Sequence, residues 1–396
     1  MKILIVKPSS LGDIIQALPV LRLLKLHFRD AEIFWCVDPR FAALLEGDPD
    51  LAGIVLFQRE RWSSPVHWPD MARAIQWIRA RHFDWVIDLQ GLLRSALFAW
   101  LARGDLLIGL NNPREGGREG ASALYDIAVS DSDVDANRPL AGGAATGNLH
   151  AVGRYLSVLP ALGVPVHMNF KWLPECPAVA AAVKSKWRRS CAQERDEAGV
   201  PASSTLPVPA QTARSPRLLI ALQPGARWPT KRWPAQNFAE LLRLFAQNIP
   251  DARFIVMGGA DDKTLGDVVA SAAPDRDHVL NLCGETTLPE TVELLRLCSL
   301  MITNDTGPMH TAAALGIPVV ALFGPTDPRN SGPYGQLENV MQIDLPCSPC
   351  LKSYCRWGES APRAPGGRRR PTTMECLTAI TPEAVFQFAQ KKLQAW

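Results

Sequence analysis

Residues 302–333 read ITNDTGPMHTAAALGIPVVALFGPTDPRNSGP, and their pattern decides the fold. An apolar run with strand character ends in Asn304 and Asp305, and a Thr-Gly pair then leads into a helix of small residues over about 308–315. A second apolar strand, 319–323, follows. In open parallel sheets ligands sit at the carboxyl ends of the strands, where a helix N-terminus offers free N–H groups and partial positive charge. The stretch therefore predicts a phosphate site in an α/β domain.

Apolar runs with strand character alternate with helical patterns along most of the chain. The strand candidates are 3–6, 33–37, 54–57, 85–89 and 106–109, and then 218–222, 254–257, 279–282, 300–303, 319–323 and 340–343. The helical patterns between them are 13–27, 41–46, 70–81, 92–102, 149–162, 237–247, 265–272 and 289–297. This alternation predicts an α/β protein built from doubly wound, Rossmann-like parallel sheets.

A change in composition separates the two series. Residues 194–217 carry four prolines among Ser, Thr, Ala and Gly, which indicates an interdomain linker or a surface insertion. We therefore expect an N-terminal domain over 1–193, a linker over 194–216 and a C-terminal domain over 217–380. A last helix within 381–396 could pack back on the first domain.

The overall composition is that of a globular protein with modest charge. The chain has 396 residues and a formal net charge of +3, too small to predict a nucleic-acid partner. The N-terminus reads directly into a strand and a glycine turn, unlike a signal peptide, and no stretch of about 18 apolar residues predicts a transmembrane segment. We expect a cytoplasmic protein whose nine cysteines are free thiols or a metal site rather than a disulfide framework.

The first strand leads into the turn KPSSLGD at residues 7–13. Asp13 stands where a helix begins, so it suits an N-cap. Alternatively, a carboxylate at the end of this strand would face a ligand cleft and could accept the proton of an attacking hydroxyl, as inverting sugar transfer requires. The spacing alone leaves both roles open.

Two turns of the second half carry further polar residues. The turn after 218–222 holds Gly225 and Lys231, a flexible point charge that could follow a leaving diphosphate. The turn after 254–257 holds Asp261 and Asp262, of which one could accept hydrogen bonds from ribose hydroxyls and one could cap a helix.

The opening stretch adds two candidates, Asp305 and His310. Asp305 could bind a sugar hydroxyl or position the Lys231 ammonium. His310 lies one helical turn after Thr306, so it should face the same ligand, although a lone histidine is more often a structural residue.

These motifs resemble those of glycosyltransferase family nine, the bacterial heptosyltransferases. The family has an Asp-Thr/Ser-Gly, a His three residues on, an Ala-rich helix and a Phe-Gly-Pro-Thr-Asp-Pro turn, as at 305–328 here. It begins with a strand and Lys-x-Ser-Ser-x-Gly-Asp, as at 7–13, and it has a Lys before a Trp-Pro, which Lys231 matches.

The resemblance implies the GT-B fold, in which two Rossmann-like domains face a central cleft. It implies an inverting transferase that needs neither a cofactor nor a catalytic metal, with Asp13 as general base. The implied donor is the nucleotide sugar ADP-L-glycero-D-manno-heptose. The implied donor-binding residues all lie in the second domain: Gly225, Lys231, Asp261, Asp305, Thr306, Gly307 and His310.

The acceptor half resembles the heptosyltransferase I branch, which adds the first heptose to Kdo of the lipopolysaccharide inner core. The segment DLQGLLRSA at 88–96 matches that branch, and Arg114 matches it loosely, although Gly116 stands where Pro is expected. The resemblance implies a lipid A acceptor bearing Kdo or heptose, met at the inner face of the inner membrane. The implied acceptor-binding residues are Ser9, Ser10, Gly12, Gln90, Arg94 and Arg114.

Three tryptophans, Trp62, Trp68 and Trp77, lie among arginines in the same half. This mixture suits a peripheral membrane-surface contact. An ordinary charged helix face with a buried tryptophan would have the same composition.

Four cysteines near the C-terminus, Cys347, Cys350, Cys355 and Cys376, have ligand-like spacing. They could hold a structural zinc ion, or they could be free thiols or form a disulfide. Similar cysteines occur in many family members, more in the heptosyltransferase II branch than in I, so the acceptor sugar stays open. The acidic clusters at 48–50 and 131–135 lie in polar, turn-like contexts, and we interpret them as solvated loops.

Other functions remain open beside heptose transfer. They are a GT-B transferase with another nucleotide sugar, a nucleotide-sugar epimerase, and a nucleotide-sugar-binding module without catalysis. A nicotinamide dehydrogenase is disfavoured because no Gly-x-Gly-x-x-Gly follows the first strand.

Overall fold

The computed structural model describes residues 1–111, 120–130, 150–185, 218–274, 278–357 and 374–394. The chain divides into two compact units, Met1–Pro174 and Glu175–Trp396. The helical segment 177–185 belongs to the second unit, where Val183 packs in the core, whereas we expected it in an N-terminal domain ending at 193. The predicted linker lies outside the described residues.

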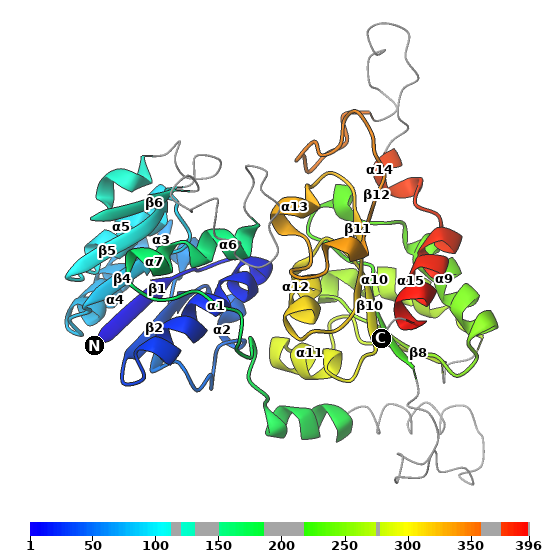
Figure 1. Ribbon diagram of the computed structural model, residues 1–396, viewed down its shortest axis with the longest axis horizontal. Coiled ribbons are helices and arrows are strands. Elements are labelled where there is room, and N and C mark those ends of the chain that lie inside the picture. The colour runs from blue at the N-terminus through cyan, green and yellow to red at the C-terminus, as the bar shows by residue number, and fades with distance from the viewer. Residues whose placement is uncertain (112–119, 131–149, 186–217, 275–277, 358–373, 395–396) are drawn as a thin grey trace, which may run out of the picture. The chain divides into compact units, whose positions relative to one another are not determined.

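The first unit is built on a six-stranded parallel sheet (Figure 1), in the order β3-β2-β1-β4-β5-β6. Its strands are β1 (Lys2–Val6), β2 (Glu32–Val37), β3 (Gly53–Leu56), β4 (Trp85–Asp88), β5 (Leu106–Asn111) and β6 (Ile127–Ser130). The strand order reverses between β1 and β4, and such a switch point is where doubly wound sheets bind ligands. The sequence predicted the first five of these strands, but not β6.

Short and long helices connect these strands: α1 (Leu11–His27), α2 (Pro39–Ala42), α3 (Arg59–Trp62), η1 (Pro65–His67), α4 (Trp68–Arg79), α5 (Leu93–Leu101), η3 (Ala121–Leu124), α6 (Ala151–Leu156) and α7 (Val158–Ala161). Helix α1 is buried on nearly every side from Ile14 to Leu24, so it is a central helix of the core. It runs unbroken through Pro19, although a proline inside a helix usually kinks it.

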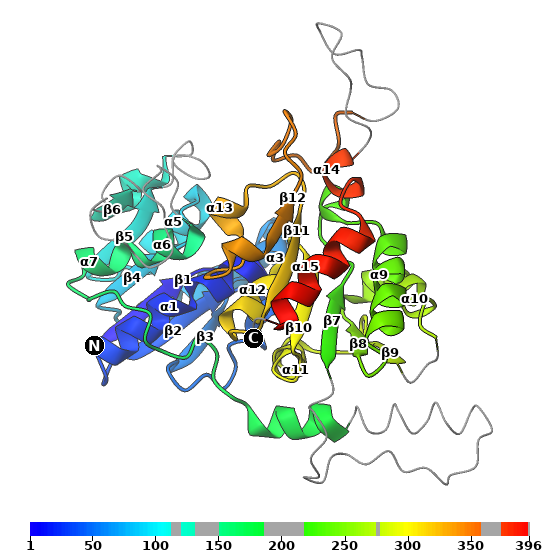
Figure 2. The same cartoon turned by 45° about the vertical axis from the view of Figure 1, so that its right-hand side comes forward.

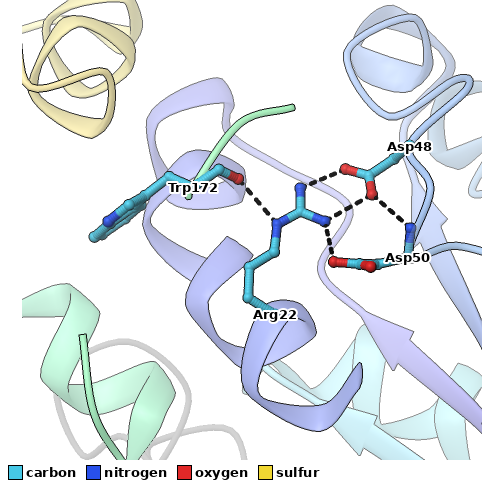
Figure 3. Close-up of polar contacts among 4 residues, drawn as sticks. All are labelled: Arg22, Asp48, Asp50 and Trp172. Carbon is cyan, nitrogen blue, oxygen red and sulfur yellow. Dashed lines mark hydrogen bonds and ion pairs between the residues drawn. The ribbon is translucent and has the colours of Figure 1, made fainter. Parts of the chain in front are cut away.

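Arg22 of α1 anchors this buried helix to two loops of the first unit (Figure 3). Its guanidinium donates to both oxygens of Asp48, at 2.7 and 2.5 Å, and to Asp50 at 2.6 Å. Its Nε donates to the Trp172 carbonyl at 3.0 Å. The interpretation of 48–50 as a solvated loop is therefore wrong, because these carboxylates neutralise a buried arginine.

The second unit repeats the same sheet topology, in the order β12-β11-β10-β7-β8-β9. Its strands are β7 (Leu219–Gln223), β8 (Arg253–Val256), β9 (Val279–Asn281), β10 (Leu300–Asn304), β11 (Val319–Phe323) and β12 (Val340–Gln342). Read in chain order, β7 and β10 take the places that β1 and β4 have in the first unit. The second switch point therefore lies where β7 and β10 end.

Helices cover both faces of the second sheet. They are η5 (Pro229–Lys231), α9 (Ala235–Asn248), η6 (Ala260–Asp262), α10 (Lys263–Ala270), α11 (Leu288–Leu295), α12 (Gly307–Ala314), α13 (Pro328–Ser331), η8 (Leu337–Asn339), α14 (Glu375–Thr378) and α15 (Pro382–Gln394). Alternate strand residues point to two cores: Ile220 and Ile302 pack toward α9 and α15, whereas Ala221 and Met301 pack toward α11 and α12.

The C-terminal helix α15 packs beside α9 within the second unit (Figures 1 and 2). Val385, Phe386 and Ala389 are buried there, and the Phe386 ring meets Phe245 of α9 edge-on at 4.9 Å. The apolar face of this helix is thus used in its own unit, which differs from our expectation that it packs back on the first domain.

Candidate active site

In the first unit, Asp13 lies at the centre of a hydrogen-bonded cluster where β1 ends. One carboxylate oxygen accepts the Ser10 backbone N–H at 2.9 Å and the Ser10 hydroxyl at 2.7 Å. The other accepts the Tyr155 hydroxyl of α6 at 2.9 Å. Lys7 is buried beside them, with its ammonium 4.7 Å from the centre of the Tyr155 ring.

In this geometry Asp13 takes part in capping helix α1, but from a different position than the sequence suggested. Helix α1 begins at Leu11 with Ser10 as its N-cap, so Asp13 is the third residue of the helix and not the N-cap itself. Its carboxylate reaches back to the N-cap backbone, as the acid of a capping box does. The oxygen bonded to Tyr155 takes no part in this capping.

The surroundings keep Asp13 ionised. Burial alone would raise the pKa of this carboxyl, but the charge of Lys7 and the hydrogen bonds from Ser10 and Tyr155 outweigh it and lower the pKa to about 2. Asp13 is therefore a carboxylate at neutral pH, able to accept a proton from a hydroxyl whose acidity rises as it attacks.

The turn after β4 holds the candidate acceptor residue Gln90 beside a buried carboxylate, and helix α5, which follows it, carries Arg94. Asp88 accepts the backbone N–H groups of Gln90 and Gly91, at 2.8 and 3.2 Å, and hydroxyls of Ser95 and Tyr125, both at 2.8 Å. Burial raises the pKa of Asp88, and these hydrogen bonds oppose that rise.

The predicted acceptor residues that the structure describes follow the carboxyl ends of β1 and β4, two neighbouring strands of the first sheet. Because Val6 is paired with Asp88, the turn with Ser9, Ser10 and Gly12 leaves the sheet beside the turn with Gln90. The Gln90 side-chain oxygen is buried and has no hydrogen-bond partner among the described residues, whereas Arg94 is exposed. Arg114 lies outside the described residues.

In the second unit, Lys231 and Asp305 form an ion pair beyond the carboxyl ends of β7 and β10. The Lys231 ammonium lies 2.6 Å from the Asp305 carboxylate and 4.9 Å from the centre of the Trp228 ring. The Thr326 hydroxyl donates to the same Asp305 oxygen at 2.6 Å. Residues from the turns after β7, β10 and β11 thus meet, and Asp305 positions Lys231 as the sequence suggested.

Asn304 holds both ends of the loop that carries Gly225 and Lys231. It is fully buried, and its side chain accepts the Trp233 N–H at 3.0 Å and donates to the Pro224 carbonyl at 2.8 Å. Sequence reasoning missed this role because nothing local links Asn304 to a loop 71 residues earlier.

Three further donor candidates, Thr306, Gly307 and His310, follow Asp305 in the chain at the start of helix α12. Thr306 is the N-cap of α12, whose first residue is Gly307, and its side chain makes no capping hydrogen bond. His310 is buried one turn further along. The N–H groups at the start of α12 and its partial positive charge are suited to a phosphate.

The acid near Gly225 is Asp262 and not Asp261. Asp262 accepts the Gly259 N–H at 3.1 Å, and a side chain at Gly225 would lie 2.2 Å from the Asp262 carboxylate. Asp261 is exposed. Close packing against Asp262 therefore explains why the turn needs glycine at 225.

The four C-terminal cysteines lie near one another, since Cys347, Cys355 and Cys350 all act electrostatically on Cys376. All four are free thiols in this structure, and among the described residues no group of three or more His, Cys, Asp or Glu side chains is arranged to hold a metal ion, so the zinc site stays a prediction. Burial and these neighbouring cysteines raise the pKa of Cys376 to about 11. Cys355 accepts the Met374 N–H at 3.4 Å.

The three tryptophans of the predicted membrane contact differ in their surroundings. Trp62 is partly buried against the core of the first unit and stacks on Phe98, with ring centres 5.8 Å apart. Trp68 and Trp77 are exposed, and the guanidinium of Arg81 lies 3.1 Å from the Trp77 ring centre. In the part of the chain that the structure describes, no helix is long and apolar enough to cross a membrane.

The sequence matches a known protein family. The family described as Glycosyltransferase family 9 (heptosyltransferase) matches residues 71–360. Lipopolysaccharide heptosyltransferase 1 of Pseudomonas aeruginosa is 28% identical, over 90% of this chain and 88% of that protein. Lipopolysaccharide heptosyltransferase 2 of Salmonella typhimurium is 27% identical, over 87% of this chain and 88% of that protein.

A solved structure supports the fold independently. The ADP-heptose lps heptosyltransferase II of E. coli superposes with a TM-score of 0.68 at 20% identity, covering 100% of this chain and 99% of that one. Two Rossmann-like units of this kind make the GT-B fold, as the sequence predicted. The chain therefore belongs to glycosyltransferase family 9, the heptosyltransferase family, and is a glycosyltransferase.

Proposed function

We propose that this enzyme transfers heptose, with inversion, from ADP-L-glycero-D-manno-heptose to a lipid A inner core that bears Kdo or heptose, in lipopolysaccharide biosynthesis. The proposal rests on two sites of opposite chemistry at matching positions of the two sheets. One offers a carboxylate, Asp13, and the other a cation, Lys231, beside a helix N-terminus.

The carboxylate activates the acceptor. As the acceptor hydroxyl oxygen attacks the anomeric carbon of heptose, its proton passes to Asp13, and the bond from that carbon to the ADP oxygen breaks. Tyr155 and Ser10 hold the carboxylate in place. Attack from the face opposite ADP inverts the anomeric configuration.

The cation stabilises the leaving group. Negative charge builds on the diphosphate as the bond breaks, and the Lys231 ammonium and the N–H groups at the start of α12 neutralise it. Asp305, itself held by Thr326, keeps Lys231 in place before the donor binds. These groups supply positive charge without a metal ion, so we expect transfer to be insensitive to chelators.

The turn after β4 and the start of α5 supply the contacts that we propose for the acceptor. The Gln90 oxygen, which has no hydrogen-bond partner among the described residues, can accept a hydrogen bond from a sugar hydroxyl, and the exposed Arg94 can pair with an anionic group of the acceptor. Because the acceptor is a lipid, we propose that the enzyme works in the cytoplasm as a peripheral protein at the inner face of the inner membrane. Arg114 stays a prediction for this role.

A donor screen tests the proposal most simply. The protein is incubated with ADP-heptose, GDP-sugars or UDP-sugars, and its thermal unfolding is followed. We expect ADP-heptose to raise the unfolding temperature most, and transfer to Kdo-bearing lipid A to proceed with that donor alone. Stabilisation and transfer with a UDP-sugar only would refute the proposed donor.

A further inference from the structure

Helix α5 carries a stripe of three large apolar residues whose side chains are about half exposed. Leu93, Leu97 and Trp100 have 45%, 47% and 53% of their surface exposed. Their spacing of four and three residues places all three on one side of the helix. Single exposed apolar residues are ordinary, but three in a row on one helix face point to a binding surface.

The opposite side of α5 is packed in the core, so the fold sets the orientation of the stripe. Ala96, Phe98 and Ala99 are buried in the core of the first unit. The Ser95 hydroxyl donates to Asp88 at 2.8 Å, which ties the first turn of the helix to the end of β4. The side opposite to the core therefore faces outward in a single, defined orientation.

The charges nearest the stripe along the chain are mostly positive, with one exposed carboxylate, Asp105, two residues beyond Arg103. Helix α5 contains no acidic residue, and two exposed arginines flank it, Arg94 in its first turn and Arg103 just beyond its last. An apolar face with leucine and tryptophan, bordered by arginine, is the composition of helices that lie in the interface of anionic membranes. A second copy of this chain is a poorer fit, because two-fold packing of α5 on itself would bring arginine against arginine.

We propose that α5 docks the first unit on an anionic lipid surface, with Leu93, Leu97 and Trp100 at the boundary of the acyl chains and Arg94 and Arg103 against the head groups. This inference rests on the proposed function only for the source of the surface, the membrane that holds the lipid acceptor. The turn that starts α5 also carries Gln90, so docking would bring this acceptor contact to the membrane.

The test uses the full-length protein and vesicles of phosphatidylethanolamine with phosphatidylglycerol, compared with vesicles of phosphatidylcholine. The variant is Leu97→Gln/Trp100→Gln. Its matched control, Leu26→Gln/Leu297→Gln, changes two leucines of similar exposure, 51% and 40%, on α1 and just after α11. Thermal unfolding checks that each protein folds, and the single variants replace the double variant if it does not.

We expect the parent and the control to float with anionic vesicles and the α5 variant to bind them at least about tenfold more weakly, since two apolar side chains no longer leave water. Parent binding should also be stronger to anionic than to phosphatidylcholine vesicles. Equal vesicle binding by the α5 variant and the parent would overturn the proposal. So would a parent that sediments as a dimer and an α5 variant that is a monomer, because the stripe would then be a self-contact.

A second readout separates this inference from the proposed function. Transfer from ADP-heptose to a deacylated, water-soluble core acceptor should be the same in the parent and the α5 variant, whereas transfer to acceptor in vesicles should fall. If no protein transfers heptose at all, the proposed function fails, and the flotation result still decides whether α5 binds lipid.

Discussion

The two units have the same sheet topology and place opposite charges at the same position. In the first unit, a buried lysine and two hydroxyl donors hold a carboxylate, Asp13, at the end of β1. In the second unit, a buried carboxylate that accepts a hydroxyl hydrogen bond holds a lysine, Lys231, after the end of β7. The shared strand order thus fixes where a site forms, and the side chains on the turns decide its chemistry.

The comparison predicts that the two sites fail in different ways. A change at Asp13 should nearly abolish transfer but leave donor binding unchanged, whereas a change at Lys231 should weaken both transfer and donor binding. The following variants are arranged from the largest expected effect to the smallest.

Replacing Asp13 with Asn should reduce transfer by about 10²- to 10⁴-fold, because the amide cannot take the hydroxyl proton. The rate is measured with saturating ADP-heptose and acceptor. Asp38→Asn is the matched control, since Asp38 caps α2 in the same unit and accepts the Arg40 N–H. An equal loss in both variants would indicate that helix capping, not proton transfer, explains the effect.

Replacing Lys231 with Ala should lower the transfer rate by about 10²- to 10³-fold, because charge on the leaving diphosphate loses its counter-ion. Lys231→Arg should recover part of the rate, since it keeps the charge but changes its geometry. The exposed Lys263 of α10 provides the control Lys263→Ala. If Lys231→Ala had the same kinetics as the parent, Lys231 would not be part of the active site.

Replacing Asn304 with Ala should destabilise the protein by about 1–3 kcal/mol, because the Trp233 N–H and the Pro224 carbonyl lose a buried partner. The Lys231 loop should also be held less firmly, so the KM for the donor should rise more than kcat falls. Urea unfolding and steady-state kinetics measure the two effects. A loss of stability with an unchanged KM would show that Asn304 has a structural role alone.

Replacing Tyr155 with Phe should raise the pKa of Asp13 from about 2 toward its ordinary value, because one hydrogen bond to the carboxylate is lost. A carboxyl whose pKa is lower in the folded protein than in the unfolded chain stabilises the fold above the unfolded pKa, and this contribution disappears as pH falls through the folded pKa.

The difference in free energy of unfolding between the parent and Tyr155→Phe should therefore be constant above about pH 4 and shrink toward about pH 2. Urea unfolding across this range measures it. A difference that does not change with pH would mean that the Tyr155 hydroxyl does not act on an ionised Asp13.

The sequence was sufficient for what depends on local pattern. Apolar runs predicted the parallel strands, and the turns after β1, β7 and β10 predicted that Asp13, Lys231 and Asp305 lie at strand ends. Local pattern could not predict contacts between distant segments. Tyr155 reaches Asp13 across 142 residues and Thr326 reaches Asp305 across 21, and neither has a local signal of its role.

The second source of error was the burial of charged side chains, which the sequence does not show. The acidic pair Asp48 and Asp50 looked like a solvated turn, but it neutralises the buried Arg22 of α1. This contact depends on packing between segments, which composition and spacing do not contain.

The most direct test of the division between the two sites is the affinity of the two variants for the donor alone. ADP-heptose is titrated calorimetrically into Asp13→Asn and Lys231→Ala without acceptor. We predict that Asp13→Asn binds with the Kd of the parent and that Lys231→Ala binds at least about tenfold more weakly, as loss of a charge-assisted contact implies. Parent affinity in Lys231→Ala together with weakened binding in Asp13→Asn would contradict the account.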